Sequence, residues 1–221
     1  MAFRYSPKIV TDGLVLYLDA ANTKSYVSGS TTWNDLSKTP NNGSLINGPT
    51  FSGSNSGSIV FDGTNDYVSI PNKSDLISGK SELSIEMWFR LTSNVRPNIF
   101  NVGPSPISFE NGSTNATTIN AITNNQLSIA CPFTLNEIIC LQYTFNNGQV
   151  SVYKNGTLVS SQTAASSTLA IIPTTNITIG TWTWVYSNFI TGNVYCVRLY
   201  NRSLTSSEVL QNYNALKGRY L

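Results

Sequence analysis

The segment "IICLQYTFNNGQVSVYKNGTLVSS", residues 138–161, decides the fold class. Its apolar residues alternate with polar ones in three short runs, and the pairs Asn147-Gly148 and Asn155-Gly156 separate these runs. An Asn-Gly pair suits the two-residue hairpin turn, in which both central residues take a positive φ. The segment therefore predicts three antiparallel strands joined by two tight hairpins.

Similar alternation recurs along almost the whole chain. Strands are expected in "GLVLYLDA" (13–20), "SIVFDG" (58–63), "DYVSIP" (66–71), "SELSIEMWFRLT" (81–92), "NITIG" (176–180), "TWTWVY" (181–186) and "NVYCVRLY" (193–200). The segment 111–125 is rich in Asn and Thr, and we interpret it as a surface loop or a weak edge strand. Many short strands separated by turn signals indicate an all-β sandwich or barrel rather than a parallel α/β sheet.

The segment 81–92 shows the period of two most clearly. Residues two apart lie on the same face of a strand. One face of this strand then carries Leu83, Ile85, Met87, Phe89 and Leu91. The opposite face carries Glu86, Trp88 and Arg90.

One helix is well specified, near the C-terminal end. Thr205 and Glu208 have the spacing of a capping box, and Leu204 lies where a hydrophobic staple to Val209 would begin. A helical apolar stripe follows, made of Val209, Leu210, Tyr213 and Leu216. Gly218 is placed to end the helix in a left-handed conformation. We expect a short helix that packs against the sandwich as a structural element.

Composition limits the classes of function. The chain has 221 residues, of which 40% are hydrophobic and only 11% charged, with a net charge of +2. Such a chain can form one large core, and it lacks the basic surface that nucleic-acid binding needs. A neutral surface of Ser, Thr and Asn suits sugars and protein contacts, and it also suits plain exposure to solvent.

The compartment is expected to be a cytoplasm. The N-terminal ten residues contain no apolar run of the signal-peptide type, and no stretch reaches the ~20 apolar residues of a membrane span. Cys131, Cys140 and Cys196 are an odd number without metal-ligand spacing, so we predict free, buried thiols.

The motifs together resemble a known family. They are "GLVLYLDAAN", "TTWNDLS", "NNGSLINGPTF", "SIVFDGTNDYVSIP", "SIEMWFRL", "VSVYKNGTLVSS", "ITIG" and "GNVYCVRLYNRSLTSSEVLQNYNALKGRY". In this order they resemble the laminin-G-like domains of the concanavalin-A-like superfamily, most of all those of tailed-bacteriophage virion proteins. The resemblance runs from Gly13 to Tyr220 and implies an antiparallel jelly-roll sandwich. We expect one domain, 13–221, preceded by an arm, 1–12. Residues 95–132 match the family poorly. If the binding loops of the family lie there, their specificity cannot be carried over to this chain.

A hydrolase is the minor interpretation. The chain has no histidine, which removes Ser-His-Asp triads and histidine metal sites. Glucanases of the superfamily carry a Glu-x-Asp-x-x-Glu strand motif, and the nearest counterpart here has Glu86 alone. Glu82 would share its face at ~13 Å, beyond the ~5–9.5 Å that spans a glycosidic bond. We therefore expect no catalytic residues, although other acidic residues could approach one another in space.

The segment "VFDGTNDYVSI", residues 60–70, raises the question of a metal site. Asp62 and Asp66 have the spacing of the first EF-hand ligands, but Tyr67 replaces the required glycine and Lys73 the bidentate glutamate. We favour a tight turn in which Gly63 takes an unusual backbone angle and Asp62 or Asn65 caps it. Some laminin-G-like domains bind calcium at the sandwich rim, which leaves a structural Ca²⁺ at Asp62 and Asp66 as the weaker alternative.

The strongest binding candidate is the segment "GTWTWVYSNF". Trp182, Trp184 and Tyr186 would lie on one face of an extended strand, where a row of rings could stack on sugars. Core packing or a subunit interface would use the same residues. Trp33 is expected to anchor the core or a loop.

Two functions of different classes stay open. The first is a non-enzymatic phage virion protein, a capsid decoration or a tail adhesin. It would form a homo-oligomer, such as a trimer, contact other virion proteins and bind a host-surface glycan. The second is a free-standing carbohydrate-binding module. In a virion protein, the N-terminal arm with Tyr5, Pro7, Ile9 and Val10 could dock on a partner as an extended strand. Alternatively, the arm could be the first edge strand of the sandwich.

Overall fold

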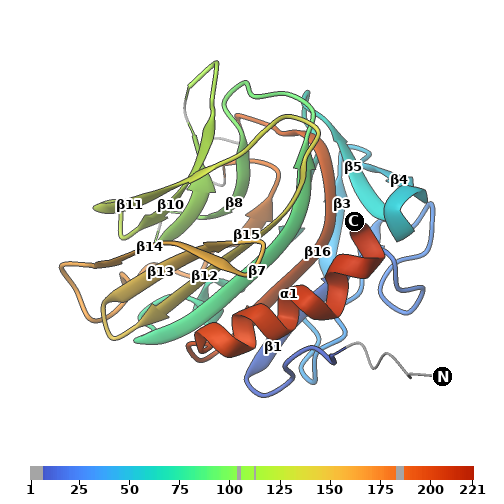
Figure 1. The fold of residues 1–221 in the computed structure, drawn as a ribbon. Coiled ribbons are helices and arrows are strands. Elements are labelled where there is room, and N and C mark those ends of the chain that lie inside the picture. The colour runs from blue at the N-terminus through green and yellow to red at the C-terminus, as the bar shows by residue number, and fades with distance from the viewer. Residues whose placement is uncertain (1–6, 104–105, 112, 183–186) are drawn as a thin grey trace.

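The structure, a computed structural model, describes residues 7–103, 106–111, 113–182 and 187–221. Within these residues the chain forms two eight-stranded antiparallel sheets, packed face to face, and one α-helix outside them (Figure 1). The predicted all-β jelly-roll sandwich with a short C-terminal helix is confirmed.

The first sheet has the strand order β14-β13-β12-β7-β16-β5-β4, and β1 pairs with β16 beside this path. Its strands are β1 (Leu14–Asp19), β4 (Thr50–Ser52), β5 (Ser58–Asp62), β7 (Glu82–Leu91), β12 (Ile138–Asn146), β13 (Gln149–Lys154), β14 (Thr157–Thr163) and β16 (Thr191–Tyr200).

The second sheet has the order β11-β10-β9-β8-β15-β6-β3-β2. Its strands are β2 (Thr32–Trp33), β3 (Gly43–Ile46), β6 (Tyr67–Ile70), β8 (Asn98–Val102), β9 (Ile107–Glu110), β10 (Thr118–Thr123), β11 (Leu127–Pro132) and β15 (Ile177–Ile179). Two short 3₁₀ turns, η1 (Ser54–Ser56) and η2 (Ser74–Leu76), lie between strands.

The two Asn-Gly pairs form the predicted hairpins. β12 pairs with β13, and β13 pairs with β14. Asn147 and Gly148 have φ values of 48° and 93°, and Asn155 and Gly156 have 54° and 76°. Two successive positive φ values match the twist of the flanking strands, so these pairs set the register of three strands.

β7 lies between β12 and β16 and separates two buried regions. Its odd-numbered side chains, Leu83 to Leu91, belong to the main core between the sheets. On the other face, Trp88 is fully buried in a second cluster with Leu216 and Tyr220 of the helix. The predicted division of the two faces is confirmed, and the second face is covered because the helix lies on it.

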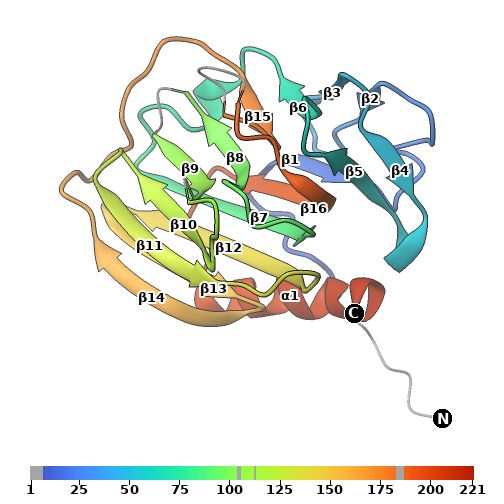
Figure 2. The ribbon, with the colours of Figure 1, turned by 90° about the horizontal axis from the view of Figure 1, so that it is seen from above.

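The helix α1 (Ser206–Tyr220) runs along the first sheet on the side away from the second sheet (Figure 2). Thr205 caps it as predicted, because its hydroxyl accepts from the Glu208 backbone N–H at 3.3 Å while its own backbone N–H donates to Glu208 Oε2 at 2.9 Å. Tyr213 stacks on Trp88 with 5.5 Å between ring centroids. The helix is thus part of the packed structure.

Two details of the predicted helix are wrong. Leu210 is 46% exposed, and Asn212 is fully buried in its place. The Asn212 amide donates to the Tyr200 hydroxyl at 3.0 Å and accepts from the Val10 backbone N–H at 2.8 Å. These bonds turn the helix so that a polar residue occupies part of the buried face.

The second wrong detail concerns Gly218, which does not end the helix. The helix continues to Tyr220. The guanidinium of Arg219 donates to both carboxylate oxygens of Asp19, at 2.8 and 3.1 Å, and the Tyr220 ring packs on Trp88. These contacts hold the last turn in helical form.

The segment 111–125 was expected to be a loop or an edge strand, and this is wrong for its second half. Residues 118–123 form β10, which pairs with β9 on one side and β11 on the other. Ile119, Ala121 and Thr123 are buried on its inner face. Alternate burial of these side chains outweighs the weak strand propensity of the surrounding Asn residues.

Residues 7–12 pack on their own domain without forming a sheet strand. Val10 is buried, and its carbonyl accepts from the Tyr200 hydroxyl at 3.1 Å. Ile9 packs against the Trp88 cluster, and Pro7 is exposed. Tyr5 lies outside the described residues. Ile9 and Val10 are therefore occupied by contacts within the domain, whereas Pro7 is not covered by the described part of the chain.

All three cysteines are buried and free, as predicted. Trp33 is fully buried in the main core, as expected of an anchor. No helix in the described part of the chain combines the length and the apolar character that crossing a membrane requires.

Candidate functional site

A small cleft of about 130 Å³ lies at one end of the second sheet. Three segments meet there: the turn into β8, the end of β9 and, about 70 residues further along the sequence, the segment after β15. The residues that line it are Arg96, Pro97, Asn98, Glu110, Asn111, Trp182 and Asn188. The cleft thus combines one large aromatic ring with amides, a carboxylate and a guanidinium.

Asn98 and Glu110 form the polar floor of this cleft. They are paired residues of β8 and β9, and the Asn98 amide donates to Glu110 Oε2 at 2.8 Å. Asn98 is only 2% exposed, yet its Oδ1 has no hydrogen-bond partner among the described residues. A buried acceptor without a partner carries a desolvation penalty of ~1–3 kcal/mol. This oxygen has almost no exposed surface, so the half-buried Glu110 carboxylate is the floor group that a bound hydroxyl can reach.

Backbone geometry positions the polar groups around this floor. The Asn111 backbone N–H donates to the Pro97 carbonyl at 2.8 Å, and the Asn111 side chain donates to the Thr118 carbonyl at 2.9 Å. Arg96 has a φ of 43°, a sparsely populated region for a non-glycine residue. Its backbone N–H donates to the Ser113 carbonyl at 2.8 Å. The loop before β8 is therefore held in a strained form beside the cleft.

Trp182 forms the aromatic wall. It is half-buried, and its backbone N–H donates to the Ser187 carbonyl at 3.1 Å in an isolated bridge. The Thr181 hydroxyl donates to the same carbonyl at 3.1 Å. Trp184 and Tyr186, predicted to share a face with Trp182, lie outside the described residues. One member of the predicted aromatic row is therefore placed in a cleft with polar groups.

The carboxyl group of Glu110 is electrostatically perturbed. Burial raises its pKa above the ordinary value, and the hydrogen bond from Asn98 partly opposes this. Rings with polar edges beside fixed amides and carboxylates match the alternating C–H faces and hydroxyls of a sugar. The arrangement can hold a small polyhydroxylated ligand.

The Asp62 and Asp66 segment is a turn. Asp62 Oδ1 accepts from the Thr64 backbone N–H at 2.7 Å, and Asp66 Oδ2 accepts from the Asp62 backbone N–H at 3.2 Å. Gly63 has a φ of 81°, and a Cβ there would lie 2.1 Å from the Thr191 hydroxyl oxygen. The favoured turn chemistry is confirmed for Asp62 and Gly63. Within the described residues, no three Cys, Asp or Glu side chains gather as a metal site would require.

Glu86 lies far from any open surface. It is 2% exposed beneath α1 and forms a buried ion pair with Arg198. Its other partners are the Trp88 indole N–H at 3.0 Å and the Gln142 amide at 3.2 Å. Glu82 sits on the same face and accepts from the Ser203 backbone N–H at 3.5 Å. Both acids are used in attaching the helix region to the first sheet.

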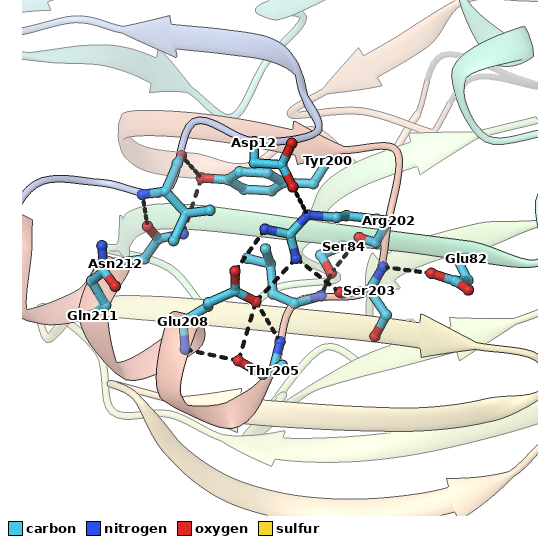
Figure 3. A network of polar contacts seen from close by, with 12 residues as sticks. Asp12, Glu82, Ser84, Tyr200, Arg202, Ser203, Thr205, Glu208, Gln211 and Asn212 are labelled. Atoms are coloured by element: carbon cyan, nitrogen blue, oxygen red, sulfur yellow. Dashed lines mark hydrogen bonds and ion pairs between the residues drawn. The ribbon is translucent and has the colours of Figure 1, made fainter.

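A second set of charged residues holds the start of α1 against the first sheet (Figure 3). Arg202 donates to both oxygens of Glu208, at 3.0 and 2.6 Å, and its Nε lies 2.8 Å from Asp12. The hydrogen bond from Arg202 lowers the pKa of Glu208 to about 2. The group connects residue 12, the end of β16 and the first turn of α1, and its role is structural.

Sequence reasoning missed most of the cleft. Asn98, Glu110 and Asn111 carried no recognisable motif, because each sits at the boundary of a strand in the poorly matching part of the chain, and Asn188 lies in the Trp-containing segment but was not singled out. The available signal was the Trp-containing segment, which identified Trp182. Its partners come from segments about 70 and 85 residues earlier, and only the fold brings them together.

Comparisons with known proteins agree with this architecture. The family model described as "Concanavalin A-like lectin/glucanases superfamily" matches residues 62–210. No curated protein matches the chain. Domain 4 of AbnA, an extracellular arabinanase from Geobacillus stearothermophilus solved with arabinotriose, has a TM-score of 0.65 at 16% identity, over 92% of this chain and 100% of that one.

Two further solved structures are similar in fold. A botulinum neurotoxin type C structure, whose cell entry depends on two ganglioside molecules, has a TM-score of 0.71 at 15% identity, over 94% of this chain and 52% of that one. Trypanosoma rangeli sialidase in complex with 2,3-difluorosialic acid has a TM-score of 0.71 at 16% identity, over 99% of this chain and 36% of that one. At these identities the likeness is one of fold. With its two antiparallel sheets and the family match over residues 62–210, the chain belongs to the concanavalin A-like lectin/glucanase superfamily.

Proposed function

We propose that this protein is a non-enzymatic glycan-binding protein of a bacteriophage virion, exposed on the particle as a capsid decoration or tail adhesin. The observation that carries the glycan-binding part is the cleft in which Trp182 accompanies the buried Asn98–Glu110 pair. Trp182 would stack on one face of a sugar ring, and Glu110, held by the Asn98 amide, would accept from its hydroxyls.

The solved structures of similar fold support a glycan as the ligand. The arabinanase domain was solved with arabinotriose, the neurotoxin depends on gangliosides, and the sialidase was solved with a sialic acid derivative. These ligands are carbohydrates or carry them. The volume of about 130 Å³ suits a single sugar ring rather than a long chain segment.

The position of the acidic residues supports binding without hydrolysis. Glycosidases need two carboxyl groups ~5–9.5 Å apart across the bond they cleave. Among the described residues that line the cleft, Glu110 supplies one carboxylate and no second one is present. Glu86, the residue nearest to the glucanase motif, is buried and paired with Arg198. We propose no catalytic residues and no cofactor.

The virion part of the proposal rests on the sequence motifs that resemble phage virion proteins and on the low charge of the surface. With 11% charged residues, copies of this domain repel one another weakly. In a homo-oligomer such as a trimer, several weak glycan contacts form together. Avidity would then raise the overall affinity for a glycan-covered surface ~10²–10⁴-fold over that of a single site.

A free-standing carbohydrate-binding module is the second candidate. It is favoured by one observation: this chain covers the whole of domain 4 of the extracellular arabinanase. Such a module would use the same cleft without any virion partner.

Two measurements test the proposal. Fluorescently labelled protein is applied to an array of bacterial surface glycans and plant oligosaccharides, with Trp182→Ala as the comparison. We expect at least one glycan that the wild type binds and the variant does not, and no products released from any ligand. Mass spectrometry of purified virions from a host that produces this protein should detect it in fixed copy number. Its absence from virions, with array binding intact, would favour the free-standing module.

A further inference from the structure

A second and larger cleft of about 540 Å³ lies beside β3 and β4, between the segments 26–31 and 47–51. Tyr26, Ser28, Thr31, Leu45, Thr50 and Phe51 are among the residues that line it. It shares no residue with the cleft at Trp182. None of the described residues that line it carries a charge, so its ligand is expected to be neutral.

The apolar part of this cleft is made by Tyr26 and Phe51. Their ring centroids lie 5.6 Å apart with an interplanar angle of 32°. The Tyr26 hydroxyl donates to the Ser30 carbonyl at 3.0 Å, which fixes the ring against its own loop. Leu45 adds an aliphatic surface beside them. Tyr26 is 3% and Leu45 7% exposed, so the half-buried Phe51 ring supplies most of the apolar surface that a ligand can reach.

The walls are fixed by hydrogen bonds. The Ser30 hydroxyl donates to the Thr32 carbonyl at 2.9 Å and accepts from the Thr32 backbone N–H at 3.0 Å. The Leu45 backbone N–H donates to the Thr31 carbonyl at 2.8 Å. On the opposite wall, the Asn47 amide donates to the Asn65 carbonyl at 2.9 Å. Both walls are therefore held in place before a ligand arrives, which reduces the entropy lost on binding.

The rim keeps polar groups available. The side-chain hydroxyls of Ser28, Thr31 and Thr50 are exposed and make no hydrogen bond with the described residues. Gly29 and Gly48 have φ values of 86° and 103°, and a Cβ at either would meet no atom within 4 Å. The glycines leave the rim open, and the hydroxyls can donate to or accept from a ligand.

We propose that this cleft is a second carbohydrate site, which binds a neutral oligosaccharide and makes the domain bivalent. An apolar patch receives the C–H face of a sugar ring, and uncharged hydroxyls around it meet the sugar hydroxyls. A volume of about 540 Å³ accommodates more than one ring. With two clefts, a single copy of the domain can bind two glycan chains or two positions on one chain. Even the monomer would then bind a glycan-covered surface more tightly than either cleft alone.

Saturation-transfer NMR with arabinotriose, cellotriose, maltotriose and mannotriose tests this site separately from the first. The measurement uses Trp182→Ala, in which the first cleft has lost its aromatic wall. Two variants are then added to that background, Thr50→Trp and Ser28→Trp, each at an exposed rim position where an indole fills the cleft. Thr157→Trp, at an exposed position on β14, is the matched control.

We expect Trp182→Ala to give saturation transfer to at least one neutral trisaccharide. Thr50→Trp or Ser28→Trp should reduce that signal at least tenfold, and Thr157→Trp should leave it unchanged. No transfer from Trp182→Ala to any of the four sugars, with a native melting temperature, would overturn the proposal. So would transfer that both rim variants retain. Transfer that is equal for the wild type and Trp182→Ala, and that the rim variants lose, would support the proposal and show that these four sugars do not use the first cleft.

Discussion

Asn98 at the start of β8 donates its side-chain N–H to Glu110 at the end of β9, with 2.8 Å between Nδ2 and Oε2. This bond uses an N–H of the side-chain amide and leaves the side-chain oxygen, Asn98 Oδ1, without a partner among the described residues. Glu110 keeps a second oxygen for which the structure shows no bond to the described residues. Glu110 therefore presents an acceptor in the same cleft as Trp182, and a polyhydroxylated ligand is a natural source of donors.

Glu110→Gln is expected to stabilise the unliganded protein at neutral pH. Burial raises the folded-state pKa of Glu110, so the folded state holds this proton more tightly than the unfolded chain does. Stability is therefore lost as the pH rises from the unfolded pKa, ~4.3, through the folded pKa. The glutamine can still accept from Asn98 and carries no charge to desolvate.

Thermal unfolding at pH 7 and pH 3.5 checks this prediction. The melting temperature of Glu110→Gln should exceed that of the wild type at pH 7, and the difference should shrink at pH 3.5. Asp75→Asn, at an exposed position, is the control and should show no such pattern. An equal difference at both pH values would show that the buried charge is not the cause.

Glu208→Gln is expected to destabilise the protein with the opposite pH dependence. The pKa of Glu208 is lowered to about 2, chiefly by the hydrogen bond from Arg202. Its contribution is fully present above the unfolded pKa of ~4.3 and is lost as the pH falls through about 2. Urea unfolding should show a lower free energy of unfolding for the variant at pH 7 and a smaller gap at pH 2.5. A gap that widens on acidification would refute this reading of Figure 3.

Breaking the buried Glu86–Arg198 pair is expected to be among the most destabilising polar changes in the chain. Glu86→Leu leaves the fully buried Arg198 guanidinium without its carboxylate, at a cost of ~3–5 kcal/mol. The double variant Glu86→Leu/Arg198→Leu removes both charges and should be less destabilised than the single one. Denaturant unfolding of both variants decides the matter, and a double variant at least as destabilised as Glu86→Leu would contradict the account.

The three thiols are expected to be inert in the folded protein. Cys131, Cys140 and Cys196 are buried, and burial raises the pKa of each, to about 11 for Cys131. Only the thiolate reacts readily with disulfide reagents. Ellman's reagent at pH 8 should label none of them in native protein within minutes and all three in guanidinium. Rapid labelling of Cys140 or Cys196 in native protein would show that the buried face under α1 opens easily.

Local signals explain why much of the fold could be predicted. Asn147-Gly148 defines its hairpin through the φ values of two adjacent residues, and Thr205 with Glu208 forms its capping box across one helical turn. The alternation in β7 needs only the period of two. Each of these depends on residues within a few positions of one another, which is the range that a single sequence reveals.

The errors and omissions have non-local causes. Gly218 stays helical because Arg219 reaches Asp19, 200 residues away in the sequence. Leu210 is exposed because Asn212 bonds to Val10 and Tyr200. Apart from Asn188, the cleft partners of Trp182 come from the start of β8 and the end of β9, and nothing in their own neighbourhoods distinguishes them from ordinary loop residues.

The most direct test of glycan binding at Trp182 is isothermal titration calorimetry with the oligosaccharide that binds most strongly on the array. Wild type, Trp182→Ala and Leu158→Ala are compared, the last being an exposed apolar residue on β14 away from the cleft. Losing an aromatic anchor costs ~2 kcal/mol, which is ~30-fold in affinity. We predict that Trp182→Ala binds at least ~30-fold more weakly and that Leu158→Ala binds as the wild type does. An unchanged affinity in a folded Trp182→Ala protein would contradict the account.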